Sequence, residues 1–279
     1  MTVVSEINVL VTGLGLQPYP DGTDGGRIDE NTSYLVTTLL PRTLEPKTAL
    51  NPSANRINII TLPHYVRSEY RYVRAFCRDL HQKHADDVDV FIHLGEARGW
   101  TWLTLERAAY KQGMSSNWWS AVEQSEYYTA ADDVGQTIKD LEPCPWVRLP
   151  MGLRSALDID AVADGASAIL KSRYQFERAG VCDDRLDPRA DDANAVVSDS
   201  GVQRRSPIDI RPHDEGGPYL CGFLNYESLA NRYAKRRELN VLFCHIPGEA
   251  DPANLSRTRD GILAITVAAA NEVGRRGKK

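Results

Sequence analysis

Four short apolar runs along the chain predict buried β-strands. They span residues 7–12, 57–62, 88–94 and 241–245, and none alternates strictly between apolar and polar positions. Such runs are typical of strands that are covered on both faces of a sheet. Between the second and third runs, residues 65–84 carry apolar side chains at helical spacing. We therefore expect a βαβ unit, in which the two strands are parallel and the crossover is right-handed.

Three more segments predict helices. Apolar side chains recur at helical spacing over residues 155–176, and residues 222–237 follow a glycine-bearing turn. The last segment begins at Asp251-Pro252, a good N-cap followed by proline at the first helical position. Strands that alternate with helices are typical of a three-layer α/β fold. We expect one domain over residues 1–279, with function gathered beyond the carboxyl ends of its strands.

Two stretches differ from this pattern. Residues 17–31 are rich in proline, glycine and aspartate, and residues 179–217 are acidic with few large apolar side chains. We expect the second stretch to be a mobile surface insertion. At Gly13-Leu14-Gly15 the sequence favours a tight turn over a dinucleotide site, because Gln17 and Pro18 stand where a helix should begin.

Composition narrows the class of protein. The 279 residues are 42% hydrophobic and 25% charged, which supports a sizeable core. A net charge of −5 and the lack of a basic-aromatic patch argue against a nucleic-acid partner. No apolar stretch is long enough to cross a membrane and the N-terminus resembles no signal peptide, so a reducing, cytoplasmic compartment is expected. The five cysteines are irregularly spaced and form neither a disulfide framework nor a zinc motif, so we expect no metal.

Cys221 is the cysteine best placed for chemistry. It follows a Gly-Gly-Pro turn at the start of a predicted helix, where unpaired N–H groups and the helix dipole favour a thiolate. His245 ends the apolar run at residues 241–245. A cysteine poised to ionise and a histidine at a strand end indicate a cysteine-nucleophile hydrolase. The other cysteines have plainer interpretations: Cys77 and Cys244 in the core, Cys144 in a loop, and Cys182 in an acidic segment that disfavours thiolate.

Position alone leaves the role of His245 open. A buried, hydrogen-bonded structural histidine is an equally good interpretation of this residue. By itself, Glu106 would be a surface charge or a partner for Arg107. The remaining histidines also have structural interpretations: His81 and His84 as solvated residues at the end of a polar helix, His213 as part of the loose insertion, and His64 and His93 as satisfied groups at strand ends.

Four motifs together resemble the pyroglutamyl peptidase I (pyrrolidone-carboxylate peptidase) family of cysteine peptidases. Residues 9–15, VLVTGLG, are similar to the family's VLVTGFGPF, and residues 95–109, GEARGWTWLTLERAA, to its G-x-A-G-G-R-x-x-I-T-x-E-R-V-A. Residues 217–221, GPYLC, are similar to its A-G-x-Y-x-C, and residues 243–247, FCHIP, to its F-I-H-V-P. The four motifs occur in the family's order.

This resemblance implies a fold, a reaction and a set of residues. The fold is a twisted, mostly parallel sheet between helices, phosphorylase/hydrolase-like, in agreement with the α/β pattern above. Cys221 is implied to be the nucleophile, His245 the general base and acid, and Glu106 the group that orients the imidazole. The implied reaction removes an N-terminal pyroglutamyl residue from a peptide with a blocked N-terminus, without a cofactor and with the oligomeric state left open. The substrate pocket is implied to include Leu14, Leu16, Gln17, Glu96 and Trp100.

Several positions depart from the family pattern. Leu14, Leu16 and Gln17 occupy a region where the family usually carries aromatic residues. Arg98 stands where the family has glycine, and Trp100 where it has arginine. Three hypotheses follow: an active pyroglutamyl peptidase, a related cysteine amidohydrolase with a shifted acyl pocket, and a catalytically silent binding protein that keeps the fold.

Overall fold

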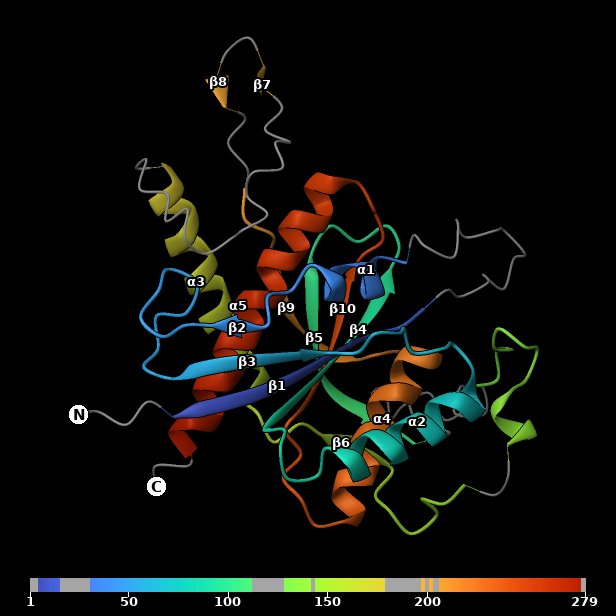
Figure 1. Ribbon diagram of the computed structural model, residues 1–279. Helices are drawn as coiled ribbons and strands as arrows, with labels where there is room; N and C mark the ends of the chain where they lie inside the picture. The colour runs from blue at the N-terminus through green and yellow to red at the C-terminus, as the bar shows by residue number, and fades with distance from the viewer. Residues whose placement is uncertain are drawn as a thin grey trace.

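A mixed eight-stranded β-sheet forms the centre of the protein in the computed structural model (Figure 1). The structure describes residues 5–15, 31–111, 128–141, 144–178, 197–198, 201–202 and 206–276. The strand order is β2-β3-β1-β4-β10-β5-β6, and β9 pairs with β5 outside this path. The strands are β1 (Glu6–Gly13), β2 (Thr43–Leu44), β3 (Arg56–Thr61), β4 (Val90–Ala97), β5 (Leu103–Tyr110), β6 (Gly152–Arg154), β9 (Ile210–Glu215) and β10 (Val241–Pro247). A separate antiparallel pair joins β7 (Val197–Ser198) to β8 (Gly201–Val202).

The four strands that the sequence predicts are β1, β3, β4 and β10, which lie side by side in parallel in this sheet. β3 and β4 both pair with β1 in parallel, and β10 pairs with β4 in parallel. The strands of the predicted βαβ unit are therefore parallel, with β1 lying between them. The apolar pattern does not predict β2, β5, β6 or β9. β2 and β6 are only two and three residues long, and β9 has the polar sequence IRPHDE.

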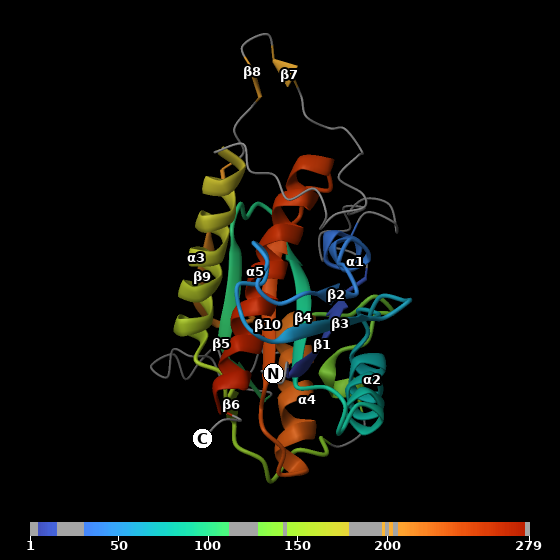
Figure 2. The same ribbon diagram turned by 60° about the vertical axis from the view of Figure 1, so that its left-hand side comes forward.

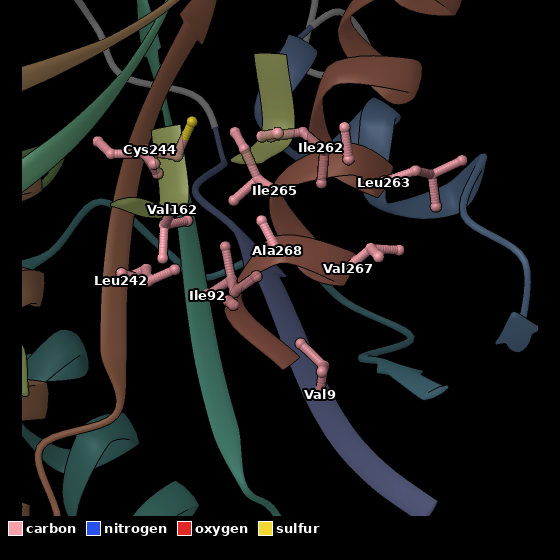
Figure 3. Close-up of a cluster of buried hydrophobic side chains, with 14 of the residues drawn as sticks. Val9, Ile92, Val162, Leu242, Cys244, Ile262, Leu263, Ile265, Val267 and Ala268 are labelled. Carbon is pink, nitrogen blue, oxygen red and sulfur yellow. The ribbon is translucent and has the colours of Figure 1, made fainter. Parts of the chain in front are cut away.

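Helices cover both faces of the sheet (Figures 1 and 2). One face carries α1 (Thr32–Thr38), α3 (Ile159–Arg178) and α5 (Pro252–Arg276), and the other carries α2 (Tyr70–Lys83) and α4 (Leu220–Ala234). A short 3₁₀ helix, η3, spans Ile138–Asp140. Figure 3 shows the first layer, where strand residues such as Val9, Ile92 and Leu242 pack against α5. The three-layer α/β fold is thus confirmed.

The helix predicted over residues 65–84 begins later, at Tyr70. Residues 65–69 lie beside the turn that follows β1. There Gly15 N donates to Val66 O at 2.7 Å, and Val66 N donates to Gly13 O at 2.9 Å. These backbone bonds hold the segment extended, which delays the helix.

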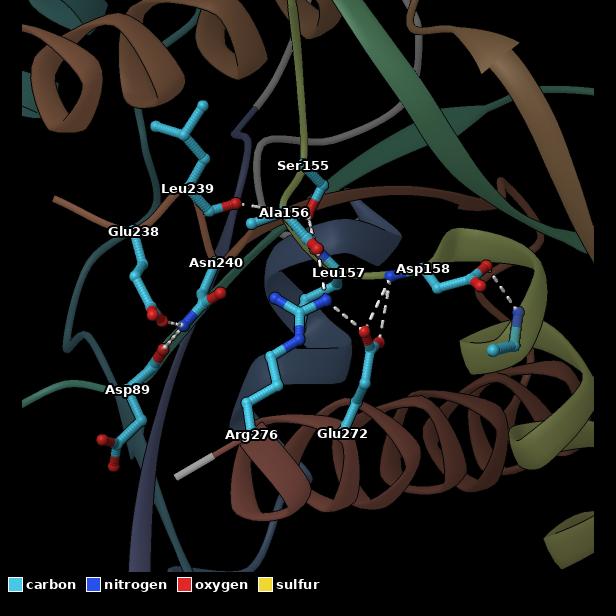
Figure 4. A network of polar contacts seen from close by, with 11 residues as sticks. Asp89, Ser155, Ala156, Leu157, Asp158, Glu238, Leu239, Asn240, Glu272 and Arg276 are labelled. Atoms are coloured by element: carbon cyan, nitrogen blue, oxygen red, sulfur yellow. Dashed lines mark hydrogen bonds and ion pairs between the residues drawn. The ribbon is translucent and has the colours of Figure 1, made fainter. Parts of the chain in front are cut away.

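A polar network at the amino ends of β4 and β10 sets the start of α3 (Figure 4). Ala156 N donates to Leu239 O at 2.9 Å, and Asp158 N donates to Glu272 of α5 at 2.9 Å. The Asp158 carboxylate then caps the helix by accepting from Ala161 N at 3.1 Å. Because these bonds fix the preceding turn, α3 begins at Ile159 and not at residue 155.

The other two predicted helices start close to their expected positions. α4 begins at Leu220, two residues before the predicted start. α5 begins at Pro252 as predicted, and Asp251 Oδ1 accepts from Ala253 N at 3.0 Å. None of the helices in the described ranges is long and apolar enough to cross a membrane.

The end of the predicted insertion belongs to the sheet. β9 pairs in parallel with β5, and Ile208 and Ile210 are buried in the core. The expectation of a loose segment is therefore wrong for residues 206–217. Residues 208–211 alternate between buried isoleucines and the exposed Asp209 and Arg211. Residues 17–30, and residues 179–205 apart from β7 and β8, lie outside the described residues, as does Cys182.

Candidate active site

The alternation of side chains along β10 and β5 builds one half of the site. Cys244 and Ile246 of β10 join the core beneath α5, so His245 between them faces α4. β5 runs antiparallel to β10 with Thr104 opposite His245. Two residues further along β5, Glu106 faces the same side as Thr104. The register of the two strands thus brings a carboxylate to the imidazole.

Glu106 is buried and accepts three hydrogen bonds. Its Oε1 accepts from His245 Nδ1 at 2.8 Å and from Thr104 Oγ1 at 2.7 Å, and its Oε2 accepts from His213 Nδ1 at 2.6 Å. Burial raises the pKa of the Glu106 carboxyl, but the hydrogen bonds from the two histidines outweigh this and lower it below its ordinary value. Glu106 is therefore ionised, and both of its oxygens act only as hydrogen-bond acceptors. Each histidine must carry a proton on Nδ1 and present Nε2 on the far side of its ring.

Cys221 comes from the first turn of α4. It is the second residue of the helix after the N-cap Tyr219, and no side chain caps this end. The first N–H groups of a helix lack intrahelical partners and lie at the positive end of its dipole. Glycines allow the preceding turn to lie against the helix: Gly217 has a φ of 76°, and a Cβ on Gly222 would stand only 2.0 Å from Gly217 O. An anion beside Cys221 would therefore meet backbone donors.

The Cys221 thiol lies close enough to the His245 ring to act on its pKa. Cys221 is 7% exposed and His245 8% exposed. Burial lowers the pKa of His245, but the attraction and hydrogen bond of Cys221, together with those of Glu106, raise it well above its ordinary value. The surroundings of His245 thus favour an imidazolium held between the sulfur and the carboxylate. The structure therefore brings together the three residues that the sequence motifs single out.

The predicted pocket residues lie at different places around this centre. Trp100 is next to it, with its ring edge-on to the His245 ring at 5.6 Å between centroids. Leu14 is fully buried in the cluster that contains Cys221 and Phe243. The Glu96 carboxylate accepts from Thr32 N and Thr32 Oγ1 at 3.0 Å, and from Arg98 Nε at 3.1 Å. Both of its oxygens are thus engaged by the protein. Leu16 and Gln17 lie outside the described residues.

His213 is the site residue that the sequence interpretation missed. It was assigned to the loose insertion, whereas it lies on β9 directly opposite Glu106 of β5. The signal that could have revealed this strand is the period of two over residues 208–211, IDIR, just before the polar residues of β9. Thr104, which donates to Glu106, was likewise not singled out.

The other histidines and cysteines are separate from this site. His81 and His84 were expected to be solvated, but both are buried, and His81 Nε2 lies 2.6 Å from Ser228 Oγ. His93 is a satisfied structural group, as one interpretation held, while His64 is exposed. Cys77 and Cys244 are confirmed as core thiols, and burial raises the pKa of both. Among the described residues, no group of three or more His, Cys, Asp or Glu side chains is arranged to hold a metal ion.

The comparison with solved structures points to one fold. No protein-family model and no curated protein matches the sequence. Among solved structures, the chain is similar to pyrrolidone carboxyl peptidase from Thermococcus litoralis, with a TM-score of 0.59 and 12% identity over 97% of this chain and 96% of the other. A mutant pyrrolidone carboxyl peptidase from Pyrococcus furiosus gives a TM-score of 0.58 and 16% identity over 96% and 100% of the two chains. Pyroglutamyl peptidase I from Bacillus amyloliquefaciens gives 0.56 and 17% identity over 96% and 98%. The chain therefore has the fold of the pyroglutamyl peptidases.

Proposed function

We propose that this protein is a cysteine exopeptidase that removes an N-terminal pyroglutamyl residue from peptides. The observation that carries the proposal is the buried series Cys221–His245–Glu106, in which the thiol contacts the imidazole and the imidazole donates to the carboxylate at 2.8 Å. Nucleophile, base and orienting group in hydrogen-bonding order are the arrangement that acyl transfer requires. The shared fold with pyroglutamyl peptidases supports the choice of acyl group.

In the proposed first step, Cys221 Sγ attacks the carbonyl carbon that joins the pyroglutamyl group to the next residue. A C–S bond forms, the C–N bond breaks through a tetrahedral oxyanion, and His245 gives its Nε2 proton to the leaving amine. The N–H groups at the start of α4 lie beside Cys221. Donors of this kind stabilise an oxyanion by about 3 kcal/mol each.

In the second step, water attacks the thioester. His245, now neutral, takes a proton from the water at Nε2, a C–O bond forms, and Cys221 leaves as a thiolate with release of pyroglutamate. Glu106 stabilises the imidazolium that develops in this step, because its Oε1 accepts from His245 Nδ1. The carboxylate keeps its charge throughout.

Trp100 is proposed to line the leaving-group side of the site. The leaving amine must reach His245 to take a proton, and the Trp100 ring is edge-on to that imidazole. Trp100 also stacks on Trp102 at 5.5 Å between centroids. This aromatic pair offers an apolar surface to the residue that follows the pyroglutamyl group.

The test is initial-rate hydrolysis of pyroglutamyl-aminomethylcoumarin under reducing conditions. Wild type should hydrolyse it, and Cys221→Ala should lose activity by about 10³-fold or more. The matched control is Cys144→Ala, a partly exposed thiol outside the site, which should keep full activity. Full activity in Cys221→Ala would rule out the proposed nucleophile. A folded wild type that cleaves another N-acyl amide in preference to the pyroglutamyl one would favour the shifted acyl pocket.

A further inference from the structure

Two imidazoles share the Glu106 carboxylate. His245 Nδ1 lies 2.8 Å from Oε1, and His213 Nδ1 lies 2.6 Å from Oε2. The two histidines come from strands that flank β5 on either side, β10 and β9. His213 is the register partner of Glu106, so the contact is fixed by backbone pairing and not by a flexible loop. Glu106 is thus held at both oxygens.

The two imidazoles differ in their access to solvent. The His213 side chain is 45% exposed, whereas that of His245 is 11% exposed and that of Glu106 is fully buried. His213 can therefore exchange protons with water directly, while the inner pair is shielded. Trp100 is edge-on to both rings, at 5.6 Å from His245 and 5.7 Å from His213 between centroids. One indole therefore packs on both imidazoles.

We propose that His213 is a positioning residue for the hydrolysis, which holds the Glu106 carboxylate in place for His245 and, when it takes up a proton, weakens the support that Glu106 gives to His245. This inference rests on the proposed function for its effect on turnover. Its effect on Cys221 itself does not depend on the substrate. His213 touches neither sulfur nor substrate in this account, and acts through Glu106 alone.

Glu106 is the main electrostatic partner of His213. Hydrogen bonding to Glu106 raises the pKa of His213 above its ordinary value, against the effect of partial burial. The ring also bonds the Glu215 backbone, and the His245 charge opposes protonation. The neighbouring charged side chains are already paired: Arg107 with Asp160 of α3 and with Asp214, and Arg211 with Asp209. The Glu215 carboxylate lies two residues further along β9, and Cys221 of α4 lies beyond His245.

The direction of the pH effect follows from this arrangement. Below its pKa, the His213 ring is positively charged and lies beside Oε2 of Glu106. The carboxylate then stabilises the His245 imidazolium less well. A less stable imidazolium is a weaker partner for the Cys221 sulfur, and it also slows the deprotonation of water by His245. Activity should therefore fall as the pH drops through the pKa of His213, at a pH above the ordinary histidine value of about 6.5.

Two substitutions separate the hydrogen bond that His213 gives to Glu106 from the positive charge that His213 can take up. His213→Asn places an amide N–H where Nδ1 lies and cannot take up a proton, so it should hold the carboxylate without the charge. We expect kcat within about threefold of wild type, and an acid limb of the pH profile that moves down by about one pH unit. His213→Ala removes the donor, and kcat should fall about tenfold with KM nearly unchanged. The control is His84→Asn, at the end of α2 distant from the site, which should match wild type.

Two readouts are measured across the pH range for each folded variant. The first is kcat and KM for pyroglutamyl-aminomethylcoumarin, and the second is the rate of Cys221 alkylation by iodoacetamide, followed on its own peptide by mass spectrometry. A downward shift of both acid limbs in His213→Asn supports the inference. If the wild type is active but both His213→Asn profiles superimpose on it, or His213→Ala keeps full kcat, the inference is overturned while the proposed function stands. If the alkylation profile shifts but the pyroglutamyl substrate is not cleaved, the proposed function fails and the coupling of His213 to Cys221 stands.

Discussion

Gly95 lies directly beneath the Cys221 thiol. A Cβ on Gly95 would stand 2.8 Å from Cys221 Sγ and 2.7 Å from the Cζ atom of Phe243. Gly95 of β4 is also the register partner of His245 in β10. The missing side chain therefore leaves the space in which the sulfur meets the imidazole. A residue from the middle of a parallel sheet thus decides where the thiol lies.

Gly95→Ala should impair the reaction more than the fold. The added methyl group must displace the thiol or the Phe243 ring, and a displacement of this size costs about 100-fold in kcat/KM. Overpacking should lower the free energy of unfolding by about 1–3 kcal/mol. Steady-state kinetics and denaturant unfolding measure the two effects. Gly165→Ala is the control, since its Cβ would lie 3.4 Å from that of Ala268, and it should keep full activity. Wild-type kinetics in Gly95→Ala would contradict this account of the site.

Glu106→Gln should lower kcat by about 10²–10⁴-fold with little change in KM. An amide of the same shape offers one acceptor and one donor, so it cannot accept from both His245 and His213. One imidazole must then turn or change tautomer. The change is measured by steady-state kinetics, with circular dichroism to check the fold. Glu272→Gln serves as control, because Glu272 bonds Asp158 N at the opposite end of the strands. Equal activity in the two variants would exclude an orienting role for Glu106.

Trp100→Ala should reduce kcat/KM by about tenfold. The indole packs on both imidazoles, and each aromatic contact of this kind contributes about 0.5–1.5 kcal/mol. Trp102→Ala is the matched control, since Trp102 stacks on Trp100 and lies under Arg211. It should have the smaller effect, because its contact with the histidines is indirect. A larger loss in Trp102→Ala than in Trp100→Ala would contradict the assignment of the main contact with the histidines to Trp100.

The core histidines should make the folded state sensitive to acid. His81 Nε2 and His93 Nε2 lie 2.6 Å and 2.8 Å from Ser228 Oγ. Burial lowers the pKa of His81 to about 2 and that of His93 to about 3. The unfolded chain takes up protons at these residues near pH 6.5, while the folded chain does not. Stability should therefore fall below about pH 6.5, by up to about 1.4 kcal/mol per pH unit for each histidine.

Replacing one of these histidines isolates its share of the acid sensitivity. In His81→Leu, the slope of unfolding free energy against pH should decrease by about one proton between about pH 6 and pH 4.5. Urea unfolding at a series of pH values gives this slope for wild type and variant. His64→Leu is the control, because His64 is exposed and should leave the slope unchanged. Equal slopes for His81→Leu and wild type would mean that His81 is protonated in the folded state.

The sequence predicts the parallel centre of the sheet well, because a continuous apolar run can be recognised without knowing what it pairs with. It predicts the meeting of Cys221, His245 and Glu106 only through the resemblance of four motifs, since 139 residues separate Glu106 from His245. Strand β9 was missed because Ile210 is its only large apolar residue, and most of its other side chains, His213 among them, are polar. The burial of His81 was missed because its partner Ser228 lies 147 residues away. The contacts of Glu106 with His245 and of His81 with Ser228 come from tertiary structure, which no local pattern encodes.

The most direct test of the central claim is labelling with the chloromethyl ketone of pyroglutamate, followed by peptide mass spectrometry. The account predicts one label per chain, on Cys221, with loss of hydrolysis in proportion to labelling. It also predicts that Cys221→Ala takes up no label. A label on any other residue, or a Cys221 that stays unmodified in a folded and hydrolytically active protein, would contradict the assignment of Cys221 as the nucleophile for a pyroglutamyl group.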